Sequence, residues 1–112
     1  MTTQLTEMAK EGSTFVVQAA FTNEDGDAVT PDSIAWTLTD AAGRVVNSRE
    51  DVAVGSPAST IHIVLSGDDL LFDGYVGQMR VLTVEATYTS ALGSGLPLND
   101  VARFAVAPLV AV

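Results

Sequence analysis

The sequence has no cysteine, and its 112 residues include one histidine, one tryptophan and five lysine or arginine residues. Without cysteine there is no disulfide framework and no thiolate metal site, so the fold depends on packing and hydrogen bonds, as suits a protein made in a reducing cytoplasm. The five basic residues stand against fourteen acidic ones, and the resulting net charge of -9 repels nucleic-acid phosphates. We therefore expect no nucleic-acid partner.

The sequence also has no long apolar run. Its apolar segments are far shorter than the roughly 20 residues that cross a bilayer, and residues 1–12 lack the apolar core of a secretory signal. We expect a soluble protein without a signal peptide or a membrane partner. At 47% hydrophobic and 17% charged residues, the chain can form one core, which predicts a single domain over 1–112, with an N-terminal arm or first strand at 1–12 and a C-terminal tail at 108–112.

Apolar and polar side chains alternate along several segments, which is typical of half-buried β-strands. The alternation predicts strands at 14–22, 34–38, 60–66, 79–90 and 101–107, a hairpin partner at 44–48 after the turn 40–43, and a short first strand within 1–8. Segments rich in Gly, Pro, Asn and Asp predict loops at 23–33, 55–59 and 91–100. A single helical turn is predicted over Asp68–Phe72, with Ser66 or Asp68 as its cap.

The inward faces of these strands define the predicted core. Its members are Phe15, Val17, Phe21, Ile34, Trp36, Leu38, Ile61, Ile63, Leu65, Leu82, Val84, Tyr88, Phe104 and Val106. About seven closely spaced strands with almost no helix predict an all-β fold, an antiparallel β-sandwich.

Trp36, on the inward face of a central strand that leads into a hairpin, makes the chain similar to an immunoglobulin-like β-sandwich, in which an aromatic residue of strand C fills the space between two sheets. The resemblance implies that the helical turn lies in the E–F crossover, and that Tyr75 of the segment Asp73-Gly74-Tyr75, or Tyr88, ties down that corner. Antibody-type members bracket the tryptophan with two cysteines. Here Ala19 and Ala86 stand in that layer, so the antibody-type subclass is not implied.

Residue types that perform catalysis are sparse. His62 lies on the polar face of its predicted strand, and the sequence places no acidic or nucleophilic partner beside it, which favours a surface histidine. The serines lack the G-x-S-x-G setting of a nucleophile, and there is no Gly-rich phosphate loop. We predict that the protein is not an enzyme and binds no cofactor.

The acidic segment 23–27 resembles half of a calcium loop, because hard cations bind clustered oxygen ligands. The candidate ligands are Asn23, Asp25, Asp27 and Asp32, with Asp68, Asp69 and Asp73 as a group that could complete the shell. Gly26 stands two residues too early for an EF-hand, and no glutamate occupies the twelfth position. Ordinary solvated turns are the favoured interpretation.

A single acidic domain without a signal peptide resembles the small accessory proteins of tailed-phage virions, and the segments VNSREDVAV, TIHIVLSGDDL and RVLTVEATYTSALGSGLPLND are similar to short proteins encoded among phage head and tail genes. The resemblance implies a non-enzymatic virion protein, made in the host cytoplasm and placed at the head–tail neck (collar) or on the head as decoration. Its partners would be other virion proteins or further copies in a homo-oligomer or ring.

Such a module binds through its surface. The sheet edges and the two terminal segments are the expected contacts, because an extended segment can add a strand to an open edge. The interface candidates are Leu5, Met8, Leu109, Val110 and Val112. The alternative is a carbohydrate- or host-surface-binding immunoglobulin-like module, which would need exposed loop aromatics such as Phe72 and Tyr75.

Overall fold

A computed structural model describes residues 2–4, 9–70 and 79–107, and these residues form strands joined by turns, with a single 3-10 turn. The elements are β1 (Thr2–Gln4), β2 (Ala9–Lys10), β3 (Thr14–Ala20), β4 (Ser33–Thr39), β5 (Val52–Ala53), β6 (Thr60–Ser66), η1 (Gly67–Leu70), β7 (Met79–Ser90) and β8 (Gly93–Ala107). The all-β class predicted from the alternating pattern is confirmed. No helix in these described ranges is long and apolar enough to cross a bilayer.

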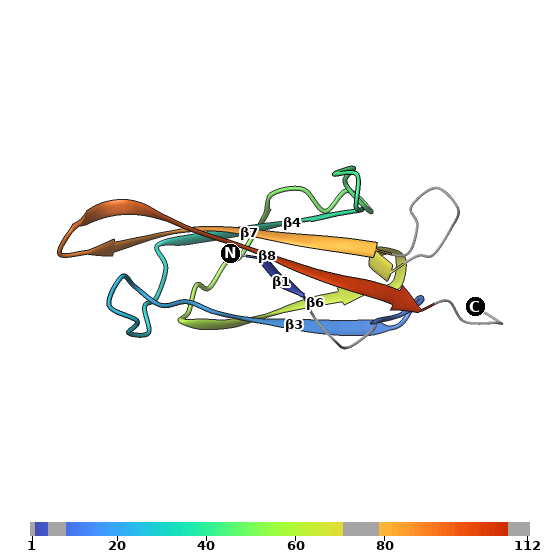
Figure 1. Ribbon diagram of the computed structural model, residues 1–112, viewed down its shortest axis with the longest axis horizontal. Coiled ribbons are helices and arrows are strands. Elements are labelled where there is room, and N and C mark those ends of the chain that lie inside the picture. Colours follow the sequence, from blue (N-terminus) through green and yellow to red (C-terminus); the bar gives the residue numbers. More distant parts are fainter. Residues whose placement is uncertain (1, 5–8, 71–78, 108–112) are drawn as a thin grey trace.

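The strands form two layers (Figure 1). The larger, curled sheet has the order β1-β8-β7-β4-β5, and β2 also pairs with β8. The second sheet contains β3 and β6, which are antiparallel from Thr14 opposite Ser66 to Ala20 opposite Thr60. The apolar faces of the two layers meet in the middle of the molecule.

The larger sheet is mixed, whereas the sequence predicts a purely antiparallel one. β1 runs parallel to β8, with Thr2 opposite Val101, and β2 is also parallel to β8, with Ala9 opposite Val106. A parallel pair needs a long connection, and the short spacing between successive strands favours antiparallel pairs. Here almost the whole chain is the connection, because the first strand meets the last.

The hairpin partner predicted at 44–48 forms only at its start. Val45 makes an isolated antiparallel bridge to Thr39, and the N–H of Val46 donates to the Leu38 carbonyl at 2.9 Å, but the named strand on this side of β4 is β5. Asn47 and Ser48 have φ values of 55° and 57°, in the left-handed region, where an extended strand cannot continue. The chain therefore turns at these two residues, and the Arg49 carbonyl then accepts the N–H of Leu38 on β4 at 2.8 Å.

The loop predicted at 91–100 is also wrong, because β8 begins at Gly93 and only Ala91 and Leu92 form the turn. The glycines belong to a bulge: Tyr88 pairs with Leu96 but Ser90 pairs with Gly93, so β8 contains one extra residue. Gly95 takes a φ of 64° there, a value that favours glycine. Gly and Pro thus mark an irregular edge strand at this position.

All fourteen residues of the predicted core are buried. The rings of Phe15 in one sheet and Phe104 in the other lie 4.8 Å apart between centroids, so an aromatic pair joins the layers. Trp36 is buried on β4, between β7 and β5. The structure adds Ala9, Val46, Leu70 and Ala86 to this core.

The molecule is elongated, with extents of 53 × 23 × 22 Å. β4 pairs with β7 only as far as Ser33 opposite Thr87, while β7 and β8 continue beyond that pair as a two-stranded hairpin. This hairpin forms one end of the long axis (Figure 1). We call residues 88–97 the distal hairpin; η1 lies towards the opposite end.

Candidate functional site

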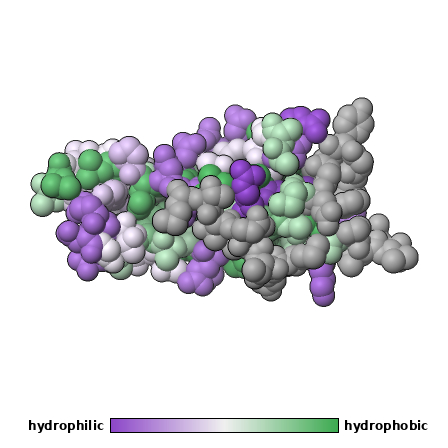
Figure 2. All heavy atoms as spheres, in the orientation of Figure 1, coloured by the Kyte–Doolittle hydropathy of each residue, from purple (hydrophilic) through white to green (hydrophobic). Residues whose placement is uncertain are grey.

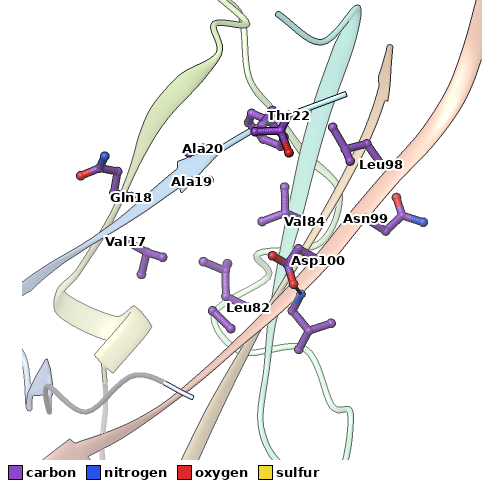
Figure 3. Close-up of a pocket in the computed structure, with 13 residues that line it drawn as sticks. Val17, Gln18, Ala19, Ala20, Thr22, Leu82, Val84, Leu98, Asn99 and Asp100 are labelled. Carbon is purple, nitrogen blue, oxygen red and sulfur yellow. Dashed lines mark hydrogen bonds between the residues drawn. The ribbon is translucent and has the colours of Figure 1, made fainter. Parts of the chain in front are cut away.

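A groove lies between β3 of one sheet and β8 of the other, and Figure 3 shows its two walls. Its volume is about 340 Å³. The buried side chains of Leu82 and Val84 on β7 lie between the walls. The remaining lining residues are Val17, Gln18, Ala19, Ala20, Phe21 and Thr22 on one wall and Leu98, Asn99, Asp100, Val101 and Ala102 on the other.

The groove exists because its walls are not hydrogen-bonded to each other. β3 pairs with β6, and β8 pairs with β7. Small side chains on both walls, Ala19 and Ala102, leave space that larger ones would fill. Among the described residues, β3 has no ladder partner on its groove side, and β8 has none between Gly93 and Asn99 on the edge that faces away from β7.

The groove suits an extended, mostly apolar segment more than a reacting molecule. Its polar side chains stand at the margin, where Gln18 points away from the cavity in Figure 3. Asp100 accepts a hydrogen bond from the backbone N–H of Val101 at 2.8 Å through Oδ1. No group of three or more His, Cys, Asp or Glu side chains that could hold a metal occurs within the described ranges.

A second feature is the polar cluster around Asp69, near the η1 end. Asp69 is 1% exposed, and Oδ1 accepts hydrogen bonds from Nδ2 of Asn47 and Nε of Arg49, both at 2.8 Å. The N–H of Ser66 donates to Oδ2 at 3.1 Å, and the fully buried Arg80 donates from Nε to the Asp69 carbonyl at 3.2 Å. These bonds join the 44–51 segment, η1 and β7.

The electrostatics of the cluster are those of a structural carboxylate. Burial alone would raise the pKa of Asp69, but hydrogen bonds from Arg49, Asn47 and Ser66, together with the Arg49 charge, outweigh it and hold that pKa below its usual value. Every buried side-chain nitrogen or oxygen in the described part of the chain has a hydrogen-bond partner. An ionised and fully bonded carboxylate is poorly suited to accept or release a proton at neutral pH.

At the other end, Tyr88 ties the β3–β4 loop to the distal hairpin. Its hydroxyl donates to Oε1 of Glu24 at 2.8 Å, and the same oxygen lies 3.1 Å from Oγ of Ser90. The hydrogen bond from Tyr88 lowers the pKa of Glu24, and the same bond raises the pKa of Tyr88. Thr89 adds a bond of 2.6 Å from Oγ1 to Oδ2 of Asp32.

Two of the candidate calcium ligands, Asn23 and Asp32, make hydrogen bonds that stabilise the β3–β4 loop. Oδ1 of Asn23 accepts the N–H groups of Asp25 at 2.9 Å and Asp27 at 3.0 Å, and Asp32 is bonded to Thr89. Asp69, part of the group that could complete the shell, belongs to η1, which lies towards the opposite end (Figure 1). The two acidic groups therefore do not meet. Asp68 is exposed in η1, so it also lies apart from the ligand candidates of the 23–32 segment.

Several sequence-based candidates have simple outcomes. His62 is exposed on β6. The helical turn is a 3-10 turn over Gly67–Leu70, and the carboxylate of Asp69 accepts the N–H of Ser66 just before the turn. Asp73, Phe72, Tyr75 and the interface candidates Leu5, Met8, Leu109, Val110 and Val112 lie outside the described residues.

Sequence reasoning missed the buried residues Asp69 and Arg80. Asp69 stands in an acidic pair with Asp68, and nothing in the pair distinguishes the buried member. Arg80 had a usable signal, because it takes an inward position in the alternation of β7, in phase with Leu82 and Val84. A charged residue in such a position indicates a buried polar cluster.

Comparison with protein-family models, curated proteins and solved structures found no match to this chain.

Proposed function

We propose that this chain is a non-enzymatic structural protein of a tailed-phage virion, placed at the head–tail neck (collar) or as head decoration, that binds neighbouring subunits through its sheet edges. The groove between β3 and β8 supports this proposal most directly. It joins apolar lining to the edge of β3 and to residues 98–99 of β8, and neither has a ladder partner on its groove side among the described residues. The placement in a virion rests on the sequence resemblance.

The occupant that we propose is an extended segment of a neighbouring subunit. β1 and β2 already lie parallel along β8, from Val101 to Ala107. A segment that continued this line along Gly93–Asn99 would add main-chain hydrogen bonds to β8 and bury side chains in the groove. This is β-strand addition, in which the ladder supplies affinity and the pockets supply specificity.

We also propose that the fold is a variant of the immunoglobulin-like sandwich. β4, β7 and β8 are hydrogen-bonded neighbours in the order expected of strands C, F and G, and β3 and β6 pair as strands B and E do. The buried Trp36 on β4 takes the place of the strand-C tryptophan. The parallel β1 and the curled sheet are the departures from the antiparallel pattern.

A carbohydrate-binding module is the weaker alternative. Sugars commonly stack on exposed aromatic rings, and the aromatic side chains of the described residues are all buried: Phe15, Phe21, Trp36, Tyr88 and Phe104. We therefore do not extend the proposal to glycans.

Particles purified from the phage that encodes this chain test the proposal. Quantitative mass spectrometry should find the chain at a fixed copy number per particle. The groove is tested by Ala19→Glu, which places a charge in the groove lining on β3, against Ala58→Glu, the same change at an exposed position outside the lining.

We expect Ala19→Glu to lower incorporation about tenfold and Ala58→Glu to leave it unchanged. Urea unfolding followed by Trp36 fluorescence is the control that checks whether both variants are folded. Absence of the chain from particles would refute the virion assignment. Equal incorporation of the two variants would refute the groove as the contact.

A further inference from the structure

The distal hairpin carries an apolar tip. Leu92, in the turn, is 74% exposed, more than the other exposed large apolar residues Val16, Val45 and Val64. Ala91 and Pro97 are exposed beside it, and Leu96 is half-buried. In Figure 2 hydrophobic surface gathers at this end of the molecule, next to strongly hydrophilic surface. Apolar residues grouped on a projection mark an interaction site more often than scattered ones do.

Side-chain hydrogen bonds brace the base of the tip, which makes it suited to docking. Tyr88 and Ser90 both contact Oε1 of Glu24, and Thr89 bonds to Asp32, so the β3–β4 loop braces the strand that leads into the tip. A braced hairpin loses little conformational entropy when it binds.

The bracing loop also gives the tip an acidic rim. Glu24, Asp25 and Asp27 are exposed there, and Asp32 follows in the same loop. The five basic residues of the chain all lie towards the other end: Lys10 pairs with Ala107, Arg80 with Phe104, Arg103 with Val81, and Arg44 and Arg49 follow β4. The distal end is therefore apolar at its tip and negative around it.

We propose that the distal hairpin inserts Leu92 into an apolar pocket of a different protein, and that lysine or arginine residues border that pocket. The inference rests on the proposed function and specifies the chemistry of one partner. Charge complementarity selects this occupant, because a basic rim attracts the carboxylates of the β3–β4 loop while the apolar tip is desolvated.

The same charges disfavour other occupants. Two distal ends would bring like charges together, and an anionic membrane would repel the rim. The η1 end of a second copy is a poor match, because Arg44 and Arg49 already form ion pairs with Asp40 and Asp69 of their own chain.

The test uses phage particles that lack this chain, to which the purified full-length protein is added back in a co-sedimentation titration. Leu92→Ser removes the apolar tip. Val64→Ser is its matched control, because Val64 is 56% exposed on the outer face of β6. We expect Leu92→Ser to weaken binding about tenfold and Val64→Ser to leave it unchanged.

The charge component is tested by the double variant Asp25→Asn/Asp27→Asn. Its control, Glu50→Gln/Asp51→Asn, removes two exposed carboxylates outside the distal end. We expect the first to bind several-fold more weakly than the second at low salt, and the difference to vanish as salt rises from about 0.05 M to about 0.5 M, because salt screens exposed charges.

The outcomes separate the two proposals. If the wild-type protein does not bind the particles, the proposed function fails and this inference fails with it. If it binds and Leu92→Ser binds equally well, the inference alone is overturned. Leu92-dependent binding to phosphatidylcholine vesicles, or a Leu92-dependent multimer of the protein alone, would also overturn it.

Discussion

The buried carboxylate of Asp69 offers a quantitative test of how the η1 end is held together. In Asp69→Asn the shape is kept and one oxygen still accepts, but an NH₂ group faces the N–H of Ser66, which loses its acceptor. A hydrogen bond to a charged group contributes about 1.5–3 kcal/mol, and a part-buried donor left unsatisfied costs about 1–3 kcal/mol. The Arg49 side chain is 43% exposed, so water screens its ion pair and we assign little to that term.

Asp69→Asn should therefore lower the free energy of unfolding by about 2–3 kcal/mol, and Asp69→Ala by about 3–5 kcal/mol, because it leaves several donors without the carboxylate. Asp68→Asn is the matched control. Asp68 is the exposed neighbour in the same 3-10 turn, so its replacement should change the free energy by less than about 0.5 kcal/mol. Urea unfolding at pH 7, followed by the fluorescence of Trp36, measures all three.

The pH dependence gives a second readout with a fixed sign. The pKa of Asp69 is lower in the folded protein than its ordinary value of 3.8, so its contribution to stability is present above that value and is lost as the pH falls through the lower folded pKa. The difference between the wild type and Asp69→Asn should be constant near neutral pH and shrink below about pH 4. A difference equal to that of Asp68→Asn, or one that grows in acid, would refute this account of the cluster.

Three further substitutions test other parts of the fold. Phe104→Ala removes a fully buried ring stacked on another aromatic ring and should cost about 3–5 kcal/mol in urea unfolding, whereas a loss below about 1 kcal/mol would contradict the packing. Tyr88→Phe should raise the pKa of Glu24 towards its ordinary value in an NMR titration, and an unchanged pKa would refute the bond as its cause. Gly43→Ala, at a φ of 89°, should destabilise by about 1 kcal/mol, while Gly55→Ala, without a positive φ or a close neighbour, should change little in thermal unfolding.

The sequence predicts the regular strands well where one face is buried. β3 and β6 alternate mainly between buried and exposed positions, and β4 and β7 mainly between buried and half-buried ones, so a two-residue period is enough to locate them. The alternation also identifies the core, because the inward face of each such strand packs against the other sheet and its apolar residues are shielded from water.

The failures occur where local and distant interactions compete. At 91–100, the residues read as loop formers, but pairing with β7 makes them a bulged edge strand. At 44–48, the alternation indicates a strand, but the left-handed residues Asn47 and Ser48 interrupt the pairing with β4 after Val46. The groove was not predicted either, because it is formed by strands of two sheets, and a local pattern does not specify which edges face each other.

The pairing of the earliest strand with the latest has a consequence for synthesis. Residues 2–4 leave the ribosome long before their partners at 101–103. Until then, the growing chain can form the β3–β6 pair and the contact between β4 and β7, but the outer margin of the larger sheet stays open. Closure of that margin is a late, non-local event, and such events slow folding and leave an edge open to mispairing with other nascent chains.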